Sequence, residues 1–284
     1  MLSVVIPIRN AADDVRDQLA ALADQSFEQP WEVVVADNGS TDGIGAVIAS
    51  FVDRLPGLRR VDASHRAGQA HAVNIGARAS TGDALLFLDA DDVVAPGYLH
   101  AMSRALTEHP FVAARLDCDA LNPPWVRNSR PRMQTDAVGT PFGFLPSGAG
   151  CSLGVRRELF ESVGGFDEDI ILGNDVDFCW RVQLASGPLV FVPEAVVQYR
   201  YRASMRGIFD QARSYGTAGP VLYRRYRHRG MPRRPWRKAL RFHGALLVRL
   251  LRIRSRSDVA EWVFLAGYRV GLVEACIGER VLYV

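Results

Sequence analysis

The chain has 284 residues and a formal net charge of +3, and 48% of its residues are hydrophobic. A chain of this size and composition can bury a sizeable core, which is typical of a globular protein with one large domain, or one domain and an appendage. The four cysteines include no C-x-x-C pair, so the sequence indicates neither a zinc site nor a disulfide framework, and we expect a reducing, cytosolic setting. No basic stretch followed by an apolar one opens the chain, so we expect no cleaved secretion signal.

Strand-like and helix-like segments alternate through residues 2–108. We predict strands at 2–7, 31–36, 58–62 and 84–88, and helices at 11–23, 42–53, 69–79 and 96–108. This alternation predicts an α/β fold with a mostly parallel central sheet flanked by helices. Asn10 is the expected N-cap of the first helix, on which Val15, Leu19 and Leu22 share one face.

Polar side chains follow three of the predicted strands, in the segments 9–10, 37–40 and 89–92. Ligands of open α/β sheets bind outside the carboxyl ends of the strands. We therefore expect these three segments to meet at one binding crevice.

The segment 89–92 reads Asp-Ala-Asp-Asp and follows an apolar strand. Its carboxylates repel one another, which indicates that a cation lies between them. Oxygen ligands suit Mg²⁺ or Mn²⁺, which take one or two protein carboxylates and fill their other positions with water and phosphate. The segment therefore predicts a divalent metal site and a phosphate-bearing substrate; the alternative is a solvated acidic turn that caps the next helix.

The second half of the chain begins with a segment, 117–147, that is rich in Pro, Arg, Asn and Gly and lacks periodicity. Such a long surface excursion is typical of a lid or a binding loop. After it we predict a strand at 149–155, a helix at 156–163, a turn at 164–167, a helix at 175–185 and a strand at 189–192.

The chain beyond Arg200 is expected to be helical. Its apolar stripe lies beside several arginines: Leu246, Leu247, Leu250 and Leu251, with Arg249, Arg252, Arg254 and Arg256. This pattern is typical of a helix that lies in a membrane interface. Residues 259–277 are apolar, but three charged residues interrupt them, so we predict a packed or surface-lying helix rather than a membrane span.

The net charge hides a strong asymmetry, since residues 1–199 carry a net −11 and residues 200–284, with 18 Arg, one Lys and five acidic residues, carry +14. This asymmetry predicts an anionic partner for the C-terminal part. No nucleic-acid motif accompanies the charge, so an anionic membrane surface is favoured over nucleic acid. The alternative is that the basic segment packs against the acidic body.

Five motifs, in this order and spacing, resemble one known family: Val4-Val5-Ile6-Pro7-Ile8-Arg9-Asn10, Val35-Ala36-Asp37-Asn38-Gly39-Ser40-Thr41-Asp42-Gly43, Gly68 with Asn74 and Gly76, Phe87 to Asp92, and Val163-Gly164-Gly165-Phe166-Asp167 followed by Asn174 to Arg181. Over roughly residues 1–200 the chain resembles the family 2 glycosyltransferases, which are inverting enzymes with a Rossmann-like GT-A fold and nucleotide-sugar donors. The resemblance implies a catalytic domain at 1–203, with a nucleotide-sugar-binding half at 1–116 and an acceptor-binding half at 117–203. Residues 204–284 would form an arginine-rich helical extension.

The resemblance also implies the donor site. Its nucleotide-sugar contacts would be Pro7, Arg9, Asp37, Asn38, Arg66, Gly68, Asn74, Asp89 and Ala90. The metal would be held by Asp91 and Asp89, with Asp89 also on the ribose side and Asp92 supporting the loop. For residues 37–42 the alternative is a strand-ending turn with a helix cap, because Asn-Gly and Ser-Thr-Asp favour turns and caps.

Asp175 matches the catalytic base of the resembled family. An inverting transfer needs one carboxylate opposite the leaving group, and the first turn of a helix favours the ionised form. Asn174, Asp177 and Trp180 are the candidate acceptor contacts, although Asp177 could instead form an exposed ion pair with Arg181, and Trp180 could belong to the core.

Three positions depart from the family pattern. Asn174 replaces a common Glu, Gln198-Tyr199 stands where a His often contacts the metal or diphosphate, and Val73 replaces an Arg. A phosphate contact could then come from Arg66 or His71. These departures concern metal affinity and donor choice more than the class of reaction.

The same residues are also compatible with other functions. Asp89-Ala90-Asp91-Asp92-Val93 also fits the nucleophile loop of a haloacid-dehalogenase-like phosphotransferase, but that loop usually follows the first strand and needs a downstream lysine, and the only lysine is Lys238. A catalytically inactive protein with the glycosyltransferase fold is a further alternative. The segment 7–10 lacks the Gly-rich turn of a nicotinamide dehydrogenase.

The sequence thus predicts a metal-dependent inverting glycosyltransferase, peripheral on the cytosolic face of the membrane. Its donor would be a UDP-, dTDP- or GDP-linked sugar, and its acceptor a saccharide or lipid-linked hydroxyl in envelope polysaccharide or glycolipid synthesis.

Overall fold

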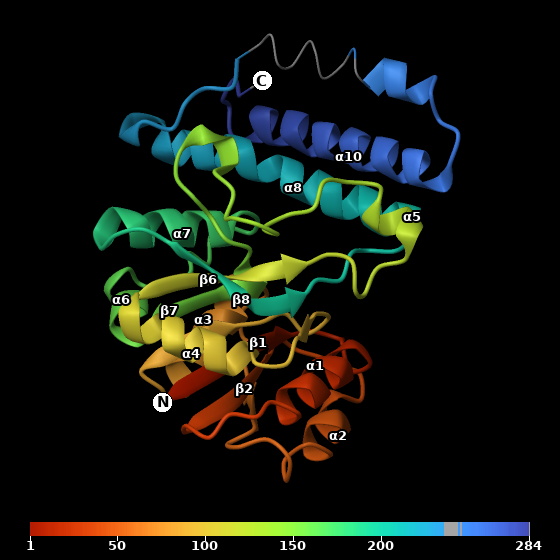
Figure 1. Cartoon of the computed structure of the whole chain (residues 1–284). Helices are drawn as coiled ribbons and strands as arrows, with labels where there is room; N and C mark the ends of the chain where they lie inside the picture. The colour runs from red at the N-terminus through yellow and green to blue at the C-terminus, as the bar shows by residue number, and fades with distance from the viewer. Residues whose placement is uncertain (236–243, 245, 284) are drawn as a thin grey trace. The chain divides into compact units, whose positions relative to one another are not determined.

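The computed structural model describes residues 1–235, 244 and 246–283 of the chain (Figure 1). They form two compact units. The first unit holds residues 1–117, 133–139 and 146–199, and the second holds 118–132, 140–145 and the chain from 200 onward. The predicted acceptor half at 117–203 is therefore divided between the units, since 118–132, 140–145 and 200–203 belong to the second.

The first unit is built on one eight-stranded sheet with the strand order β3-β2-β1-β4-β7-β6-β8-β5. The first four of these strands are parallel: β3 (Arg59–Asp62), β2 (Trp31–Asp37), β1 (Leu2–Ile8) and β4 (Ala84–Phe87). The others are β7 (Leu153–Arg156), β6 (Phe111–Asp117), β8 (Val190–Gln198) and β5 (Val93–Val94). Strand β7 is antiparallel to both of its neighbours, β5 is antiparallel to β8, and β6 is parallel to β8. The four early strands confirm the prediction, and the complete sheet is mixed.

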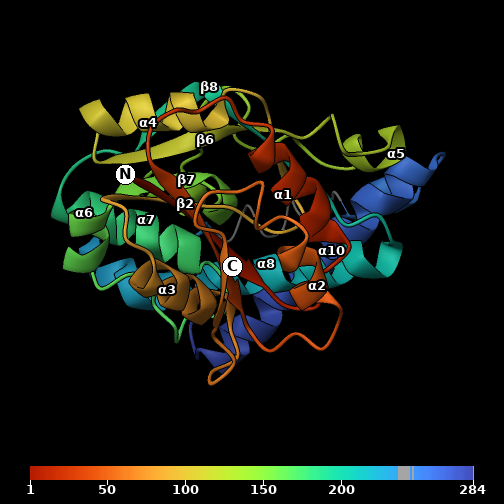
Figure 2. The same ribbon diagram turned by 90° about the horizontal axis from the view of Figure 1, so that it is seen from below.

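Helices cover both faces of this sheet (Figure 2). One face carries α3 (Gln69–Ala79), α6 (Arg157–Ser162) and α7 (Asn174–Ala185), whose apolar side chains share a core with the strands. Its centre is aromatic, since the rings of Phe166 and Phe178 stack with centroids 4.3 Å apart and Phe87 meets Phe166 edge-on. The opposite face carries α4 (Tyr98–Glu108), which approaches closely where β7 has Gly154.

Helix α1 (Asp14–Ala23) begins later than predicted, and α2 (Ile44–Ala49) is shorter. Asn10 does not cap α1; it has a left-handed backbone with φ of 52°, and its side chain accepts a hydrogen bond from the backbone N–H of Thr41 at 2.8 Å. The predicted strand 149–155 begins with a short 3-10 turn, η2 (Gly150–Ser152). Strand β6 was not predicted, because a short apolar run has no clear period.

The second unit contains α5 (Pro124–Arg127), η1 (Pro141–Gly143), α8 (Met205–Tyr226), η3 (Arg227–Arg229) and α10 (Arg256–Gly278). Helices α8 and α10 run parallel and pack through glycines: a Cβ on Gly271 would lie 1.7 Å from the carbonyl oxygen of Arg213, and one on Gly267 would lie 2.6 Å from that of Phe209. Ion pairs of Arg213 with Glu274 and of Arg224 with Glu279 flank the contact, both at 2.8 Å.

The segment 117–147, predicted as a surface excursion, also contributes to the second unit. The guanidinium of Arg130 lies over the rings of Tyr201 and Phe264, and that of Arg256 lies over Trp125 at 3.6 Å. Helix α10 matches the predicted packed helix at 259–277. Among the described residues, no helix combines the length and apolar character needed to cross a bilayer. Residues 236–243, 245 and 284 of the predicted basic helical region lie outside the described residues.

Candidate active site

The acidic segment 89–92 is held in place by glutamines from two helices. Gln18 of α1, which is fully buried, donates to the carbonyl oxygen of Asp89 at 3.4 Å and accepts from the backbone N–H of Val94 at 3.0 Å. Gln69, at the start of α3, donates to Oδ1 of Asp89 at 2.8 Å. The loop after β4 is therefore fixed at both of its ends.

Within this loop the carboxylate oxygens of Asp89 and Asp92 and the Sγ of Cys151 lie within 4.8 Å of one another. Asp92 is buried, with 1% exposure, whereas Asp89 and Asp91 are half-buried. Burial, together with the charges of Asp92 and Asp89, raises the pKa of the Cys151 thiol well above its usual value. The carboxylates suit a hard divalent cation, and a soft thiol does not.

The loop after β2 is built on Asp37 and Asn38. Asp37 is buried, with 2% exposure; it accepts from the backbone N–H of Ser40 at 2.8 Å and pairs with Arg60. Burial opposes ionisation, yet the hydrogen bonds from Ser40 and the charge of Arg60 lower the pKa of Asp37. At neutral pH this carboxylate is an acceptor. The loop is joined to the end of β1, because the backbone N–H of Asn10 donates to Oγ of Ser40 at 2.9 Å.

Asp175 lies in the first turn of α7, after Gly173, which has a left-handed backbone with φ of 78°. Its carboxylate accepts from the backbone N–H of Val176 at 2.8 Å and from that of Gly150 at 3.3 Å. Burial raises the pKa of Asp175, and these backbone hydrogen bonds only partly offset the effect. A carboxyl group with a raised pKa is better matched to proton transfer near neutral pH.

The turn η2 connects the two acidic parts of the site. Gly150 donates to Asp175, and the adjacent Cys151 lies against Asp89 and Asp92. Residues 89–92 and 175 are far apart in sequence, but both contact this one turn. The carboxylates expected to act on the two sides of a substrate are thus brought to one place in the first unit.

Comparison with known proteins gives the family. The family model described as Glycosyl transferase family 2 matches residues 3–164, more than half of the chain. A second, described as Glycosyl transferase family group 2, matches residues 84–273. The chain belongs to glycosyl transferase family 2.

Two curated relatives support this assignment. The pre-mycofactocin glycosyltransferase of Mycobacterium tuberculosis is 28% identical over 232 residues, covering 78% of this chain and 48% of the relative. The uncharacterized glycosyltransferase YibD of Escherichia coli K12 is 28% identical over 182 residues, covering 62% of this chain and 51% of the relative. The chain spans about half the length of these curated relatives.

Solved structures confirm the GT-A fold of this family 2 chain. The mannosyltransferase PcManGT from Pyrobaculum calidifontis, solved with GDP-Man and Mn²⁺, has a TM-score of 0.65 at 22% identity and covers 96% of this chain and 86% of its own. S. aureus TarS 1-349 in complex with UDP has a TM-score of 0.59 at 17% identity, covering 98% and 91% of the two chains.

Two residues predicted for donor binding, Asn38 and Asn74, hold loops of this family 2 chain together. The side-chain amide of Asn38 donates to the carbonyl oxygen of Arg66 at 2.8 Å, and its Oδ1 accepts from the backbone N–H of Gly68 at 2.9 Å. Asn74 is buried; it donates to the carbonyl oxygen of Phe166 at 2.8 Å and accepts from the backbone N–H of Phe166 at 2.9 Å. The side-chain amides of Asn38 and Asn74 thus form hydrogen bonds with backbone groups.

Glu168, which the sequence motifs did not single out, binds three of the side chains around the predicted donor site. Its carboxylate accepts a hydrogen bond from Asn74 at 2.9 Å and lies 2.7 Å from Nδ1 of His71. The guanidinium of Arg66 donates to Glu168 at 3.3 Å and to Asp169 at 2.7 Å. Arg66 and His71, predicted as phosphate contacts, thus contact the loop after the Gly-Gly-Phe-Asp turn. The signal available was that Glu168 directly follows this motif.

Two predicted acceptor contacts are inaccessible. Asp177 and Trp180 are fully buried, and Oδ2 of Asp177 accepts from Nε of Arg181 at 2.7 Å. The suggested exposed ion pair is therefore partly buried, with Asp177 fully buried and Arg181 17% exposed. A hydrogen bond from Arg181 to the carbonyl oxygen of Val163 joins α7 to the end of α6. Asn174, by contrast, is half-exposed in the first turn of α7.

The remaining predicted contacts lie near the ends of β1 and β4 and at the start of α3. Arg9 is exposed, Pro7 is half-buried and Ala90 is buried with 7% exposure. Gly68 has φ of 145°, which side chains rarely adopt, and opens the first turn of α3.

Proposed function

We propose that this chain transfers a sugar, with inversion, from a nucleotide-diphosphate sugar to a hydroxyl group of an acceptor. The family assignment supports sugar transfer in general. The observation that carries the finer proposal is the turn Gly150–Ser152, which contacts Asp175 on one side and the acidic loop 89–92 on the other.

The donor's diphosphate is proposed to lie at the loop 89–92 with a divalent cation, Mg²⁺ or Mn²⁺. We assign the ion to Asp89 and Asp91, which are half-buried, and assign Asp92, which is buried beside Cys151, to support of the loop. A bound divalent ion neutralises the charge that develops on a diphosphate leaving group. PcManGT, a structural neighbour solved with GDP-Man and Mn²⁺, supports a divalent ion together with a nucleotide-sugar donor.

Asp37 is proposed to accept from the donor's base or ribose. Its carboxylate is kept ionised by Ser40 and Arg60, and an acceptor in the loop after β2 suits the N–H of a base or a sugar hydroxyl. Arg9, exposed after β1, and Pro7 line the same side of the nucleotide in this proposal. The nucleotide is UDP, dTDP or GDP.

Asp175 is proposed as the general base. Inversion requires that the acceptor hydroxyl lose its proton as it attacks the anomeric carbon from the face opposite the diphosphate. The backbone N–H groups of Gly150 and Val176 orient the carboxylate, and its raised pKa increases its basicity. Asn174, next to the base, is the remaining candidate contact for the acceptor.

The acceptor is proposed to be a saccharide or lipid-linked hydroxyl used in envelope polysaccharide or glycolipid synthesis. The C-terminal unit is proposed to hold the enzyme on the anionic cytosolic face of a membrane, without a nucleic-acid partner. Support comes from residues 247–251, where Leu247, Leu250 and Leu251 are exposed, with 67%, 47% and 88% exposure, close to exposed Arg252 and Arg254.

The test is a panel of UDP-, dTDP- and GDP-linked sugars, measured for Mn²⁺-dependent thermal stabilisation and for release of the nucleoside diphosphate. Asp91→Asn is expected to abolish the metal dependence of donor binding, and Asp175→Asn to abolish turnover while donor binding persists. Asp53→Asn, which changes an exposed carboxylate on the same unit, is the matched control.

Three results would contradict the proposal. Loss of metal dependence in Asp92→Asn but not in Asp91→Asn would overturn the assignment of the metal ligands. Unchanged turnover in Asp175→Asn would overturn the assignment of the base, and the absence of stabilisation by every donor would favour a catalytically inactive protein.

A further inference from the structure

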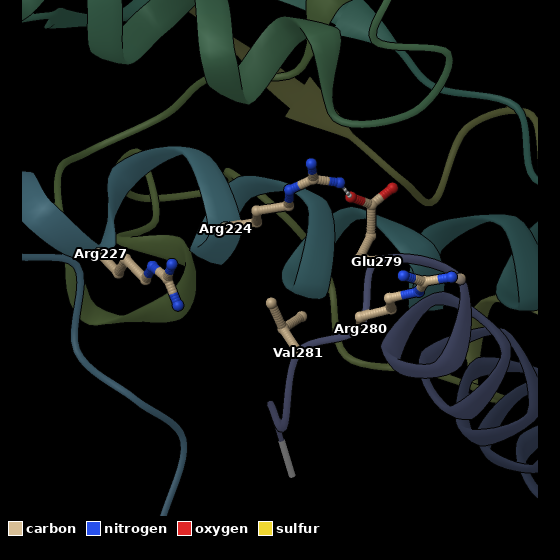
Figure 3. A pocket seen from close by; sticks show the side chains of 6 residues that line it. Arg224, Arg227, Glu279, Arg280 and Val281 are labelled. Carbon is tan, nitrogen blue, oxygen red and sulfur yellow. Dashed lines mark hydrogen bonds and ion pairs between the residues drawn. The ribbon is translucent and has the colours of Figure 1, made fainter.

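The second unit contains a cavity of about 500 Å³ at the ends of α8 and α10 (Figure 3). It is lined by Arg224, Arg227, Gly278, Glu279, Arg280 and Val281. Its volume falls in the range of small-molecule sites, roughly 300–1,000 Å³. Three arginines face one glutamate, so the cavity carries an excess of positive charge.

One of these arginines is neutralised and two are not. Arg224 pairs with Glu279 at 2.8 Å, as the dashed line in Figure 3 shows. Arg227 and Arg280 form no ion pair with any residue that the structure describes, and in this view they lie on either side of Val281. Two guanidinium groups are therefore available to an anion that enters the cavity.

The backbone of Arg280 gives a second, independent observation. Arg280 has φ of 52° and follows the last turn of α10, where the backbone N–H of Val281 donates to the carbonyl oxygen of Cys276 at 3.1 Å. Helices that end in this way usually have glycine at the left-handed position, because any other side chain is strained there. Strained residues that persist are concentrated at binding and catalytic sites. An arginine at this position stabilises the fold less than glycine would, but it places a guanidinium group at the cavity.

Helix dipoles offer a simpler explanation for some of the charge. Helices α8 and α10 are parallel, so their C-terminal ends, which favour cations, lie at the same end of the pair. Arg224 and Arg227, in and after the last turn of α8, fit this role. The dipole does not explain why α10 ends in arginine, since glycine at position 280 would leave the helix end less strained.

We propose that this cavity binds a phosphate monoester or diphosphate group through Arg227 and Arg280, with the Arg224–Glu279 pair as its wall. A guanidinium group binds phosphate oxygens through two parallel hydrogen bonds. In the described part of the chain no carboxylate pairs with Arg227 or Arg280, so their N–H groups can bind a phosphate. The phosphate belongs either to a soluble compound or to a lipid head group at a membrane surface. The cavity residues belong to the second unit, whereas the loop 89–92 belongs to the first.

The test uses the full chain in EDTA, so that no metal supports phosphate binding at the acidic loop. Sodium pyrophosphate is titrated by calorimetry and by thermal shift against sodium chloride of equal ionic strength. The variants are Arg280→Gly and Arg227→Gln, and Arg206→Gln, which removes the same charge from an exposed position at the other end of α8, is the matched control. In a second arm, flotation with vesicles that contain phosphatidic acid, whose head group is a phosphate monoester, is compared with flotation with phosphatidylcholine vesicles.

The wild type and Arg206→Gln are expected to bind pyrophosphate, and each cavity variant to bind it at least about tenfold more weakly, the loss typical of a charged hydrogen-bonding partner. Arg280→Gly is also expected to keep or raise the melting temperature in chloride, which shows that its loss of binding is not unfolding. Loss of flotation in the cavity variants but not in the control assigns the phosphate to lipid, and retained flotation assigns it to a soluble compound. Equal pyrophosphate affinity in all four proteins, or none in the wild type, would overturn the proposal and leave these arginines as helix-end charges.

Discussion

Glu32 gives the sharpest test of the physical reasoning. Its side chain lies at the start of β2 with 6% exposure and joins three segments that are distant in sequence. It accepts from Oγ of Ser3 at 2.7 Å, from Oγ1 of Thr81 at 3.0 Å and from the backbone N–H of Thr81, and it pairs with Arg59. Thr81 precedes β4, which carries the acidic loop, so this carboxylate helps to fix the strand that supports the site.

The magnitude follows from the pKa. Burial alone would raise it, but the hydrogen bonds from Thr81, Ser3 and Arg59 lower the pKa of Glu32 from 4.5 to about 2. At 1.36 kcal/mol per unit, ionised Glu32 stabilises the fold by roughly 3 kcal/mol relative to its protonated form. Since the folded-state pKa is the lower one, this stability is fully present above about pH 4.5 and is lost as the pH falls towards 2.

The assay is urea unfolding followed by circular dichroism at pH 7, 4.5 and 3. Glu32→Gln is expected to lower the free energy of unfolding by roughly 3 kcal/mol at pH 7, and the difference from the wild type is expected to shrink as the pH falls. Glu28→Gln, at an exposed position in the connection before β2, is the control and should change little at any pH. A difference between Glu32→Gln and the wild type that stays constant from pH 7 to 3 would refute the reasoning.

Three further predictions concern the site and the helix pair. Burial raises the pKa of Asp175, so kcat should begin to fall with decreasing pH at a pH above the ordinary pKa of an aspartate, 3.8. A profile of kcat against pH in which this fall occurs at or below pH 3.8 would contradict the assignment. Asn74→Ala removes both side-chain hydrogen bonds to the Phe166 backbone and should lower the free energy of unfolding of the first unit by about 3 kcal/mol in urea. A decrease below about 0.5 kcal/mol would contradict this expectation. Gly271→Ala should lower the melting temperature, because its Cβ would lie 1.7 Å from a carbonyl oxygen of α8, whereas Gly278→Ala, with nothing within 4 Å, should not; equal effects would argue against the close helix contact.

Local pattern was sufficient for much of the fold. Strands β1, β2 and β4 are short apolar runs bounded by polar residues, and α3 and α7 carry apolar side chains at helical spacing, so each was found from neighbouring residues alone. The acidic loop after β4 and the position of Asp175 at the start of α7 followed in the same way. Strand β6 was missed because its apolar run has no period that distinguishes a strand from a helix.

The sequence by itself therefore determined the α/β rhythm, the family motifs and the residue types of the candidate site. Only the tertiary structure decided that Asn38 and Asn74 hold loops, that Glu168 gathers Asn74, His71 and Arg66, and that the turn 150–152 contacts both acidic parts of the site. The physical reason is that the partners of these side chains lie some 25 to 100 residues away. Local propensity specifies where a helix or strand begins, whereas the partner of a buried amide or carboxylate is fixed only when the core brings distant segments together.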